Sequence, residues 1–395
     1  MCTRVIYTSY EGKSYTGRNM DWLECPQPQL WVLPKGVKRK AMAKPRFGKQ
    51  FSWQSKYSSV ITSALASEDD SLPNKRCTSD GMNNKGLTAN LLWLTLSDFP
   101  KRGDFRNTDK KPMSLSIWAQ YILDTCKNVS EAIKAMEHIY IQTSVINTGA
   151  RGGTEGTCHL SVGDRAGNSV VFEYIDQVLH IYTNVKNVKF SNMNGVVMHA
   201  YTKQQMQVMT NDPAFDRQIA SLDYWDELNK RYQVNGNPAM LPGSNASLSR
   251  FIRATYFTEE MNLMAQEDQK DDHMLILARL AAVMNNAAQP ATRLRSLEET
   301  PANLSRTQYN SFADQTRLQY FYRSGYSPFM IWVYLSDFKE KLKNLREGQV
   351  YKLTLDENGV YRSNHAYHSG NVTDDFKIVD MFEFIPADQK SHLIV

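Results

Sequence analysis

Residues 2–22 read CTRVIYTSYEGKSYTGRNMDW. The β-branched and aromatic content of residues 3–10 indicates a strand, EGK (11–13) indicates a turn, and residues 14–22 indicate the returning strand. The chain therefore opens with a predicted β-hairpin, and Cys2 stands at the start of its first strand. Because the second strand of a hairpin returns to the beginning of the first, Arg18 and Asp21 are expected close to Cys2.

Cys2 directly follows Met1, which is removed efficiently when the next residue is small. Removal would give Cys2 an α-amine titrating near ~7.7–8.0 beside a thiol at about 8.5. One residue would then hold a nucleophile and a base. A guanidinium such as Arg18 favours the thiolate, and a carboxylate such as Asp21 favours a protonated amine.

A plainer interpretation is a frayed terminus, with Arg18 and Asp21 in a surface salt bridge. Residues three apart on a regular strand face opposite sides of the sheet. Both side chains can therefore reach Cys2 only if the strand bends or ends there.

The composition excludes several functional classes. The 395 residues are 42% hydrophobic and 22% charged, an ordinary globular balance, and the net charge of +5 is spread along the chain. No stripe of basic and aromatic residues predicts a nucleic-acid surface. The five cysteines and eight histidines lack the spacing of a metal site or a disulfide framework, so no metal is predicted.

No apolar run approaches the ~20 residues that span a bilayer. The N-terminus also lacks the basic and then apolar stretch of a signal peptide. The expected location is cytoplasmic. The alternative is a periplasmic or secreted protein in which Met1 replaces a removed leader.

The elements follow the order strands, two helices, strands, helices, strands. Helices are expected at 114–126 and 128–139, and a helix-rich section is expected to begin at 248; the last 90 residues return to strands. This order suits an α+β fold with two antiparallel sheets packed face to face and helices outside. No linker divides it, so residues 1–395 are predicted to form a single domain.

Five motifs carry a more specific signal. They are Cys2, GRNMDW (17–22), DGMNNKGL (80–87), VMTNDPAFDRQ (208–218) and SRFIRATYF (249–257). In this order they resemble the choloylglycine hydrolase family of N-terminal nucleophile hydrolases, which contains conjugated bile salt hydrolases and penicillin V acylases. The resemblance implies a four-layer αββα sandwich. It also implies hydrolysis of a non-peptide amide by Cys2 without a cofactor.

The resemblance also implies roles for individual residues. Arg18 and Asp21 match the pair beside the nucleophile, and Asn211 matches the asparagine that helps to bind the oxyanion. Arg250 matches a second site arginine, with Arg253 as the alternative. The backbone N–H of Trp93 matches the other oxyanion donor. A tryptophan there, like residues 112–124, resembles the Gram-negative penicillin acylases.

The predicted substrate is a small acyl amide, bound by an apolar pocket that consists of Trp22, Met20, Met82, Trp93 and Leu94. Such a pocket suits the phenoxyacetyl group of penicillin V or the chain of an N-acyl-homoserine lactone. Three alternatives remain: a bile salt hydrolase, a fatty acid amidase of the acid-ceramidase type, and a degenerate binder of amphipathic ligands. A homo-oligomer is expected, a dimer or a tetramer, although the shortened segment between residues 211 and 250 argues against a tight tetramer.

Overall fold

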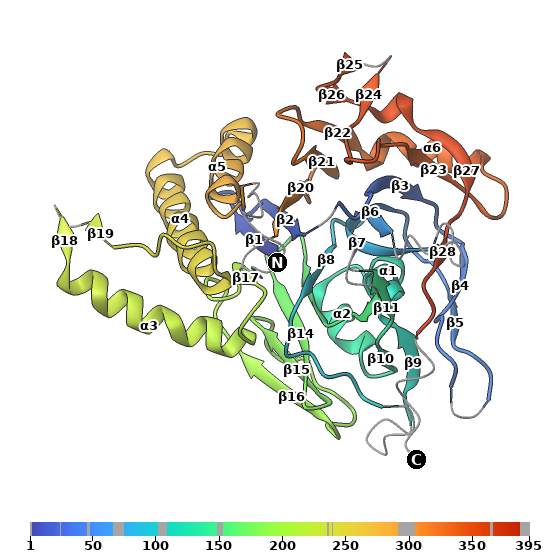
Figure 1. Ribbon diagram of the computed structural model, residues 1–395, viewed down its shortest axis with the longest axis horizontal. Helices are drawn as coiled ribbons and strands as arrows, with labels where there is room; N and C mark the ends of the chain where they lie inside the picture. Colours follow the sequence, from blue (N-terminus) through green and yellow to red (C-terminus); the bar gives the residue numbers. More distant parts are fainter. Residues whose placement is uncertain are drawn as a thin grey trace, which may run out of the picture.

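The computed structural model describes residues 2–23, 25–45, 48–65, 75–101, 109–147, 153–234, 237–238, 240–290, 305–363 and 366–387. Two large sheets pack against each other, and helices cover their outer faces (Figure 1). The predicted α+β fold with four αββα layers is confirmed. No helix in these ranges is long and apolar enough to cross a membrane.

The seven-stranded sheet contains the predicted N-terminal hairpin. Its strands, in spatial order, are β17 (Val208–Thr210), β1 (Cys2–Thr8), β2 (Ser14–Trp22), β20 (Arg306–Asp314), β21 (Gln319–Ser324), β22 (Ile331–Tyr334) and β26 (Gly370–Asn371). Cys2 pairs with Met20, and Thr3 pairs with both Asn19 and Thr210. The first strand is therefore an interior strand, held between β2 and β17.

The second sheet has eleven strands. In spatial order they are β16 (Val196–Ala200), β15 (Val178–Thr183), β14 (Ser169–Ile175), β13 (Cys158–Gly163), β8 (Thr88–Trp93), β7 (Lys75–Asn83), β6 (Ser59–Leu65), β3 (Gln29–Leu33), β23 (Gln349–Leu353) and β27 (Lys377–Asp380), with β28 (Glu383–Phe384) paired to β7. Five short two-strand pairs lie outside these sheets: β4 (Lys38–Lys40) with β5 (Ser52–Gln54), β9 (Lys111–Ser114) with β10 (Ile139–Gln142), β11 (Val145–Asn147) with β12 (Gly153–Glu155), β18 (Gln233–Val234) with β19 (Asn237–Pro238), and β24 (Arg362–Ser363) with β25 (Ala366–Tyr367).

The prediction of purely antiparallel sheets needs a correction. In the two large sheets, β15–β16, β7–β28 and β22–β26 are parallel pairs. The partners of each pair are joined by connections long enough to bring the chain back to the same end of the sheet, which a tight hairpin turn cannot do. The remaining pairs of both large sheets are antiparallel.

Helices α1 (Leu115–Thr125) and α2 (Val129–Ala135) cover the larger sheet, and α4 (Ser247–Asp268) and α5 (His273–Asn286) cover the smaller one. The second helix begins with a side-chain cap, since the Asn128 side chain accepts the backbone N–H of Glu131 at 2.9 Å. A Cβ added to Gly17 would lie 2.9 Å from Cγ of Met284. The glycine of GRNMDW therefore lets α5 pack directly onto β2.

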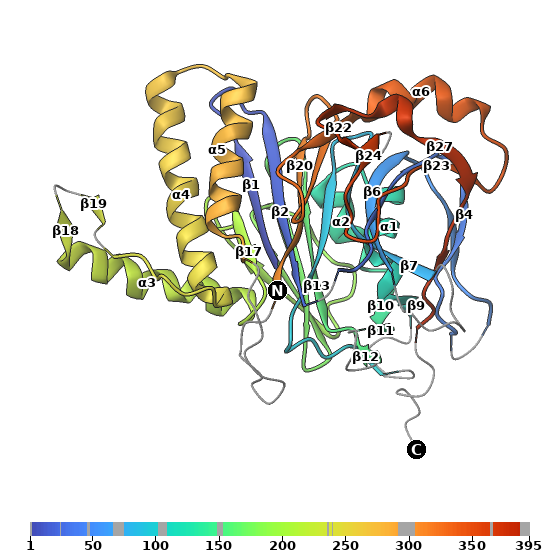
Figure 2. The same ribbon diagram turned by 45° about the horizontal axis from the view of Figure 1, so that its top comes forward.

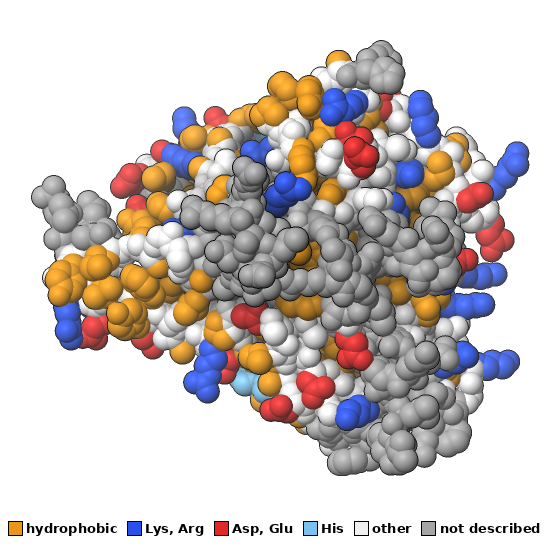
Figure 3. Space-filling view, viewed as in Figure 1, with side chains coloured by type: hydrophobic (Ala, Val, Ile, Leu, Met, Phe, Trp, Pro, Cys, Tyr) orange, Lys and Arg blue, Asp and Glu red, His pale blue; other side chains and the backbone are white. Residues whose placement is uncertain are grey.

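Helix α3 (Phe215–Arg231) was not predicted from the sequence. It extends away from the sandwich together with β18 and β19 (Figure 2), and of its residues only Phe215 and Gln218 are buried. Ile219, Leu222 and Trp225 nevertheless form an apolar stripe at helical spacing and pack against a core cluster, a signal that the sequence reasoning missed. Apolar side chains gather over this arm (Figure 3), where Tyr224 is 65% exposed. A single chain does not decide assembly, so the homo-oligomer stays a prediction.

The C-terminal part adds a small layer beside the larger sheet, with α6 (Phe338–Lys341) between two short 3-10 helices, Leu335–Asp337 and Leu342–Asn344. A third 3-10 helix, Thr373–Asp375, precedes β27. These elements lie far from the N-terminus in Figure 1 and do not cover the N-terminal hairpin.

Candidate active site

Cys2 is a buried residue held at three points. It is 2% exposed, its backbone N–H donates to Oδ1 of Asn211, and its carbonyl accepts from Nη1 of Arg250 at 2.8 Å. Its Sγ lies 3.7 Å from Nη2 of Arg18 and 3.7 Å from Sδ of Met20. The alternative of a frayed terminus is therefore wrong.

Arg18 approaches the thiol from the space between the two sheets. Its guanidinium has no exposed surface and donates to Oδ2 of Asp80 at 2.6 Å and to the Leu91 carbonyl at 2.9 Å. It also donates to Ser79 and Tyr309. Burial acts to lower the pKa of Arg18, but coulombic attraction to neighbours that include Tyr309, Cys2 and Asp80 outweighs it and raises the pKa. Arg18 is thus held as a cation beside the sulfur.

Asp21 lies on the other face of the same strand. Its Oδ2 accepts from Nη1 of Arg250, on α4, at 3.2 Å, and its Oδ1 accepts from Oγ1 of Thr307 at 2.6 Å. The β2–β20 register shifts between Met20 and Asp21, as expected if the strand bends there. Arg18 and Asp21 nevertheless act from opposite faces, as the alternation of strand residues requires. Arg18 faces the sulfur, and Asp21 binds the arginine that holds the Cys2 carbonyl.

The amide of Asn211 has a fixed orientation. Its Oδ1 accepts from the backbone N–H of Cys2 and from Nη2 of Arg250 at 3.2 Å, and its Nδ2 donates to the Trp93 carbonyl at 2.6 Å. A flipped amide would set its nitrogen against two donors and its oxygen against an acceptor. In the described part of the chain Nδ2 has no second partner, so one of its two N–H groups is left to donate to a substrate.

The structure separates the two arginines that the sequence left open. Arg250 contacts the Cys2 carbonyl, whereas Arg253 donates to the carbonyls of Pro242 and Ser244 at 2.7 and 2.6 Å. Burial lowers the pKa of Arg250, with Asp21 acting in the opposite direction. Of the two, Arg250 is the one beside the cysteine, while Arg253 fixes the chain that leads into α4.

Two buried side chains that the sequence reasoning missed support the turn that carries Asn211. Nε2 of Gln218 donates to the carbonyls of Asn211 and Pro213 at 3.2 and 2.7 Å, while its Oε1 accepts the backbone N–H of Thr210 at 3.0 Å. Oγ of Ser247 accepts the backbone N–H of Asn211 at 3.0 Å. Gln218 ends the VMTNDPAFDRQ motif, which was the available signal. The N–H and C=O groups of this turn are therefore bound by side chains from α3 and α4.

The five predicted pocket residues divide into two groups. Trp22 and Trp93 are half-buried, with ring centroids 5.0 Å apart, and Met20 is half-buried beside the thiol. Met82 and Leu94 have no exposed surface, and Met82 packs in a core cluster with Tyr309. The Met20 thioether thus adjoins the cysteine and the two tryptophans pair with each other. The pocket itself stays a prediction.

The other four thiols are shifted toward their neutral form by burial. Burial raises the pKa of Cys126 to about 12, and it also raises the pKa of Cys25, Cys77 and Cys158. A thiol with a raised pKa carries little thiolate at neutral pH. Among the described residues, Cys2 is the cysteine whose Sγ lies within hydrogen-bonding distance of a guanidinium. In the described ranges no three His, Cys, Asp or Glu side chains group as a metal site needs.

Replacing Asp80 with asparagine is expected to destabilise the fold by roughly 3–5 kcal/mol, because the change leaves the buried cation of Arg18 without its counter-ion. Urea unfolding followed by circular dichroism measures this. The matched control is Asp374→Asn, which removes a carboxylate that is 95% exposed from its pair with Lys341. That control should lose no more than about 1 kcal/mol. Equal effects of the two substitutions would contradict the role given to Asp80.

Comparison with known proteins gives a consistent picture. Residues 2–351 match the family of linear amide C–N hydrolases called the choloylglycine hydrolase family. The chain is 34% identical to penicillin V acylase of Pectobacterium atrosepticum, over 97% of this chain and 92% of that protein. It is 24% identical to a bile salt hydrolase/transferase of Clostridium perfringens, over 82% and 89% of the two chains.

Solved structures agree with this comparison. The penicillin V acylase of Agrobacterium tumefaciens superposes with a TM-score of 0.72 at 29% identity, covering 97% of this chain and 99% of that one. A mutant conjugated bile acid hydrolase of Clostridium perfringens shares the fold, with a TM-score of 0.66 at 20% identity over 93% and 98% of the two chains. The chain belongs to the choloylglycine hydrolase family and is a hydrolase of non-peptide, linear amide C–N bonds.

Proposed function

We propose that this hydrolase uses Cys2 as an N-terminal nucleophile and acts as a penicillin V acylase. The observation that supports the proposal is the environment of Cys2. Its buried thiol lies 3.7 Å from the Arg18 guanidinium, and its backbone nitrogen donates to the side chain of Asn211. Removal of Met1 would turn that nitrogen into a free amine. An amine accepts a proton, which an amide nitrogen does not do at neutral pH.

In the proposed reaction, the α-amine of Cys2 takes the thiol proton and the thiolate attacks the substrate carbonyl. The free N–H of Asn211 and the backbone N–H of Trp93 donate to the developing oxyanion. Each such donor contributes on the order of 3 kcal/mol to the lowering of the barrier. The protonated amine then gives its proton to the leaving nitrogen, and the C–N bond breaks.

The acyl group is now a thioester on Cys2. A water molecule loses a proton to the same amine and attacks the thioester carbonyl, which releases the carboxylic acid and restores the thiol. Arg250 and Asp21 fix the carbonyl of Cys2 throughout, so the nucleophile keeps its orientation. The α-amine of Cys2 takes part in every proton transfer in this sequence, and it passes the proton taken from water to the departing sulfur.

The acyl specificity rests on the aromatic pair. Trp22 and Trp93, with centroids 5.0 Å apart, offer a wall that suits the phenoxyacetyl group of penicillin V. Identity to the penicillin V acylase of P. atrosepticum also exceeds identity to the bile salt hydrolase. N-acyl-homoserine lactones are the second candidate, because the thioether of Met20 adjoins the thiol and would accommodate a flexible chain.

The test compares penicillin V, an N-acyl-homoserine lactone and a conjugated bile salt as substrates, with amine release as the readout. We expect the highest kcat/KM for penicillin V. Trp22→Leu should lower that value by about threefold to tenfold, since an aromatic contact contributes roughly 0.5–1.5 kcal/mol beyond its area. The matched control is Trp332→Leu, which changes a tryptophan of β22 whose ring pairs with that of Phe321. It should leave kcat/KM unchanged. A bile salt preferred over penicillin V would overturn the assignment.

A further inference from the structure

A cavity lies outside the proposed active site. Its volume is about 730 Å³, which falls within the ordinary range for small-molecule sites. Strand β4, the chain after α6, and the segment that leads into β28 form its walls. None of the predicted site residues lines it.

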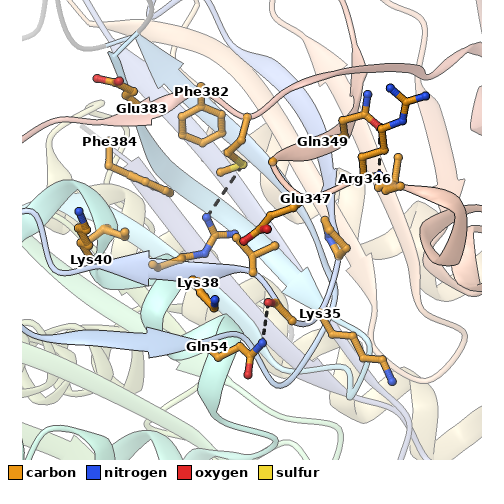
Figure 4. Close-up of a pocket in the computed structure, with 18 of the residues that line it drawn as sticks. Lys35, Lys38, Lys40, Gln54, Arg346, Glu347, Gln349, Phe382, Glu383 and Phe384 are labelled. Atoms are coloured by element: carbon orange, nitrogen blue, oxygen red, sulfur yellow. Dashed lines mark hydrogen bonds between the residues drawn. The ribbon is translucent and has the colours of Figure 1, made fainter.

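One part of the cavity wall is apolar. Phe382 and Phe384 are 8% and 5% exposed, and their rings lie 4.9 Å apart. Ile117, from α1, and Leu342 extend this surface. Figure 4 shows the two phenylalanines on one side of the cavity, with Lys35 and Gln54 on the other. Such a wall takes an alkyl or aryl group.

The charged residues of the cavity are mainly basic. Five basic side chains line it, Lys35, Lys38, Arg39, Lys40 and Arg346, against two acidic ones, Glu347 and Glu383. The lysines are exposed at the rim, whereas Arg39 is 6% exposed. The excess positive charge favours an anion over a cation.

Arg39 has unused hydrogen-bonding capacity. Its Nε donates to Oδ2 of Asp124 at 2.7 Å, but Nη1 meets only the thioether of Met381, at 4.0 Å, and Nη2 has no hydrogen-bond partner among the described residues. A buried donor without a partner costs about 1–3 kcal/mol. Met381 is a flexible side chain that also lines the cavity, so moving it would expose the Nη1–Nη2 edge. A carboxylate matches that edge with two parallel hydrogen bonds.

We propose that this cavity binds an amphipathic carboxylate, with the carboxylate on Arg39 and the apolar part against Phe382 and Phe384. The lysines of β4 attract the anion, and Met381 moves aside to admit it. Hydrolysis of a linear amide releases a carboxylic acid, so the enzyme's own product belongs to the chemical class that this site accepts.

The experiment uses decanoic acid with a photoreactive diazirine in its chain, irradiated with the full-length protein, and locates the label by peptide mass spectrometry. We expect label on residues 34–42, 342–349 or 381–384. Its methyl ester, which lacks the carboxylate, should label these peptides about tenfold less, the loss of roughly 1.4 kcal/mol of binding. Competition with decanoate and with phenoxyacetate distinguishes an alkyl from an aryl acid. Label on Cys2 peptides alone, or equal labelling by acid and ester, would overturn the proposal.

Two variants complete the test. The double charge reversal Lys38→Glu with Lys40→Glu changes exposed residues and should reduce labelling by about tenfold. The matched control reverses Lys127 and Lys134, two exposed lysines of the α2 region, and should label as the unchanged protein does. Arg39→Gln combined with Asp124→Asn removes the guanidinium without leaving a buried charge unpaired, and should abolish labelling in protein whose circular dichroism is unchanged. If both cavity variants label normally, the site does not exist.

Discussion

Replacing Cys2 with serine is expected to leave a folded protein that has lost activity on the order of 10⁴-fold or more, as when the nucleophile of other covalent hydrolases is removed. The oxygen of serine is far less acidic than a thiol, so the Arg18 guanidinium at 3.7 Å does not suffice to ionise it. The measurement is single-turnover hydrolysis of penicillin V together with a thermal unfolding curve.

The control for this variant is Cys25→Ser, which changes a half-buried thiol that the proposed reaction does not use. Its rate should equal that of the unchanged protein. A Cys2→Ser protein that hydrolyses substrate at the original rate would refute the proposed nucleophile. An unfolded Cys2→Ser protein would contradict the expectation that the serine retains the backbone contacts to Asn211 and Arg250.

Keeping a residue in front of Cys2 is expected to lower kcat by about 10²–10⁴-fold, the usual contribution of a general base. In such a chain the nitrogen that donates to Asn211 is an amide, which holds its proton. A protein that begins Met-Lys-Cys2 provides the test, because lysine blocks removal of the methionine. Mass measurement of the intact chain shows whether the extension is present.

The matched control has the same sequence downstream and a longer extension whose protease site ends directly before Cys2. Cleavage should restore the full rate, and the recovered activity should follow the appearance of the free N-terminus. This pairing separates the loss of the base from damage to the hairpin, since the same protein is measured before and after cutting. Full activity with the extension intact would contradict the role of the amine.

Parts of the site could be predicted because their signal is local. The alternation in residues 2–22 is sufficient to predict the hairpin and the nearness of Arg18, and Asn128 is sufficient to predict a helix start. Asn211 and Arg250 required a resemblance, because they are 209 and 248 residues away from Cys2 in the chain. The periodicity of a sequence predicts on which face of a helix or strand a residue lies. It does not predict which distant segment packs against that face.

The supporting polar residues could not be predicted in this way. Asp80 and Gln218 are buried polar residues that form hydrogen bonds inside the protein. A hydrophobicity pattern predicts buried apolar residues, so it does not predict that these two are buried. Helix α3 is a different case, since Ile219, Leu222 and Trp225 give it an apolar stripe at helical spacing that the sequence reasoning did not use. The parallel edge strands β16 and β26 depend on long connections whose path no local motif sets.

The interior position of the first strand also imposes an order of events during synthesis. Cys2 is 2% exposed because β2 covers one side and β17, with Asn211 after it, covers the other. While residues 208–211 are still unmade on the ribosome, the N-terminal end has no partner on that side, and an aminopeptidase can reach it. Once they fold into place, a single residue before Cys2 becomes hard for an aminopeptidase to reach, unlike a long extension that a site-specific protease can bind. If the proposed nucleophile is right, removal of the residue before Cys2 competes in time with elongation, and faster translation should raise the share of chains that keep that residue and are inactive.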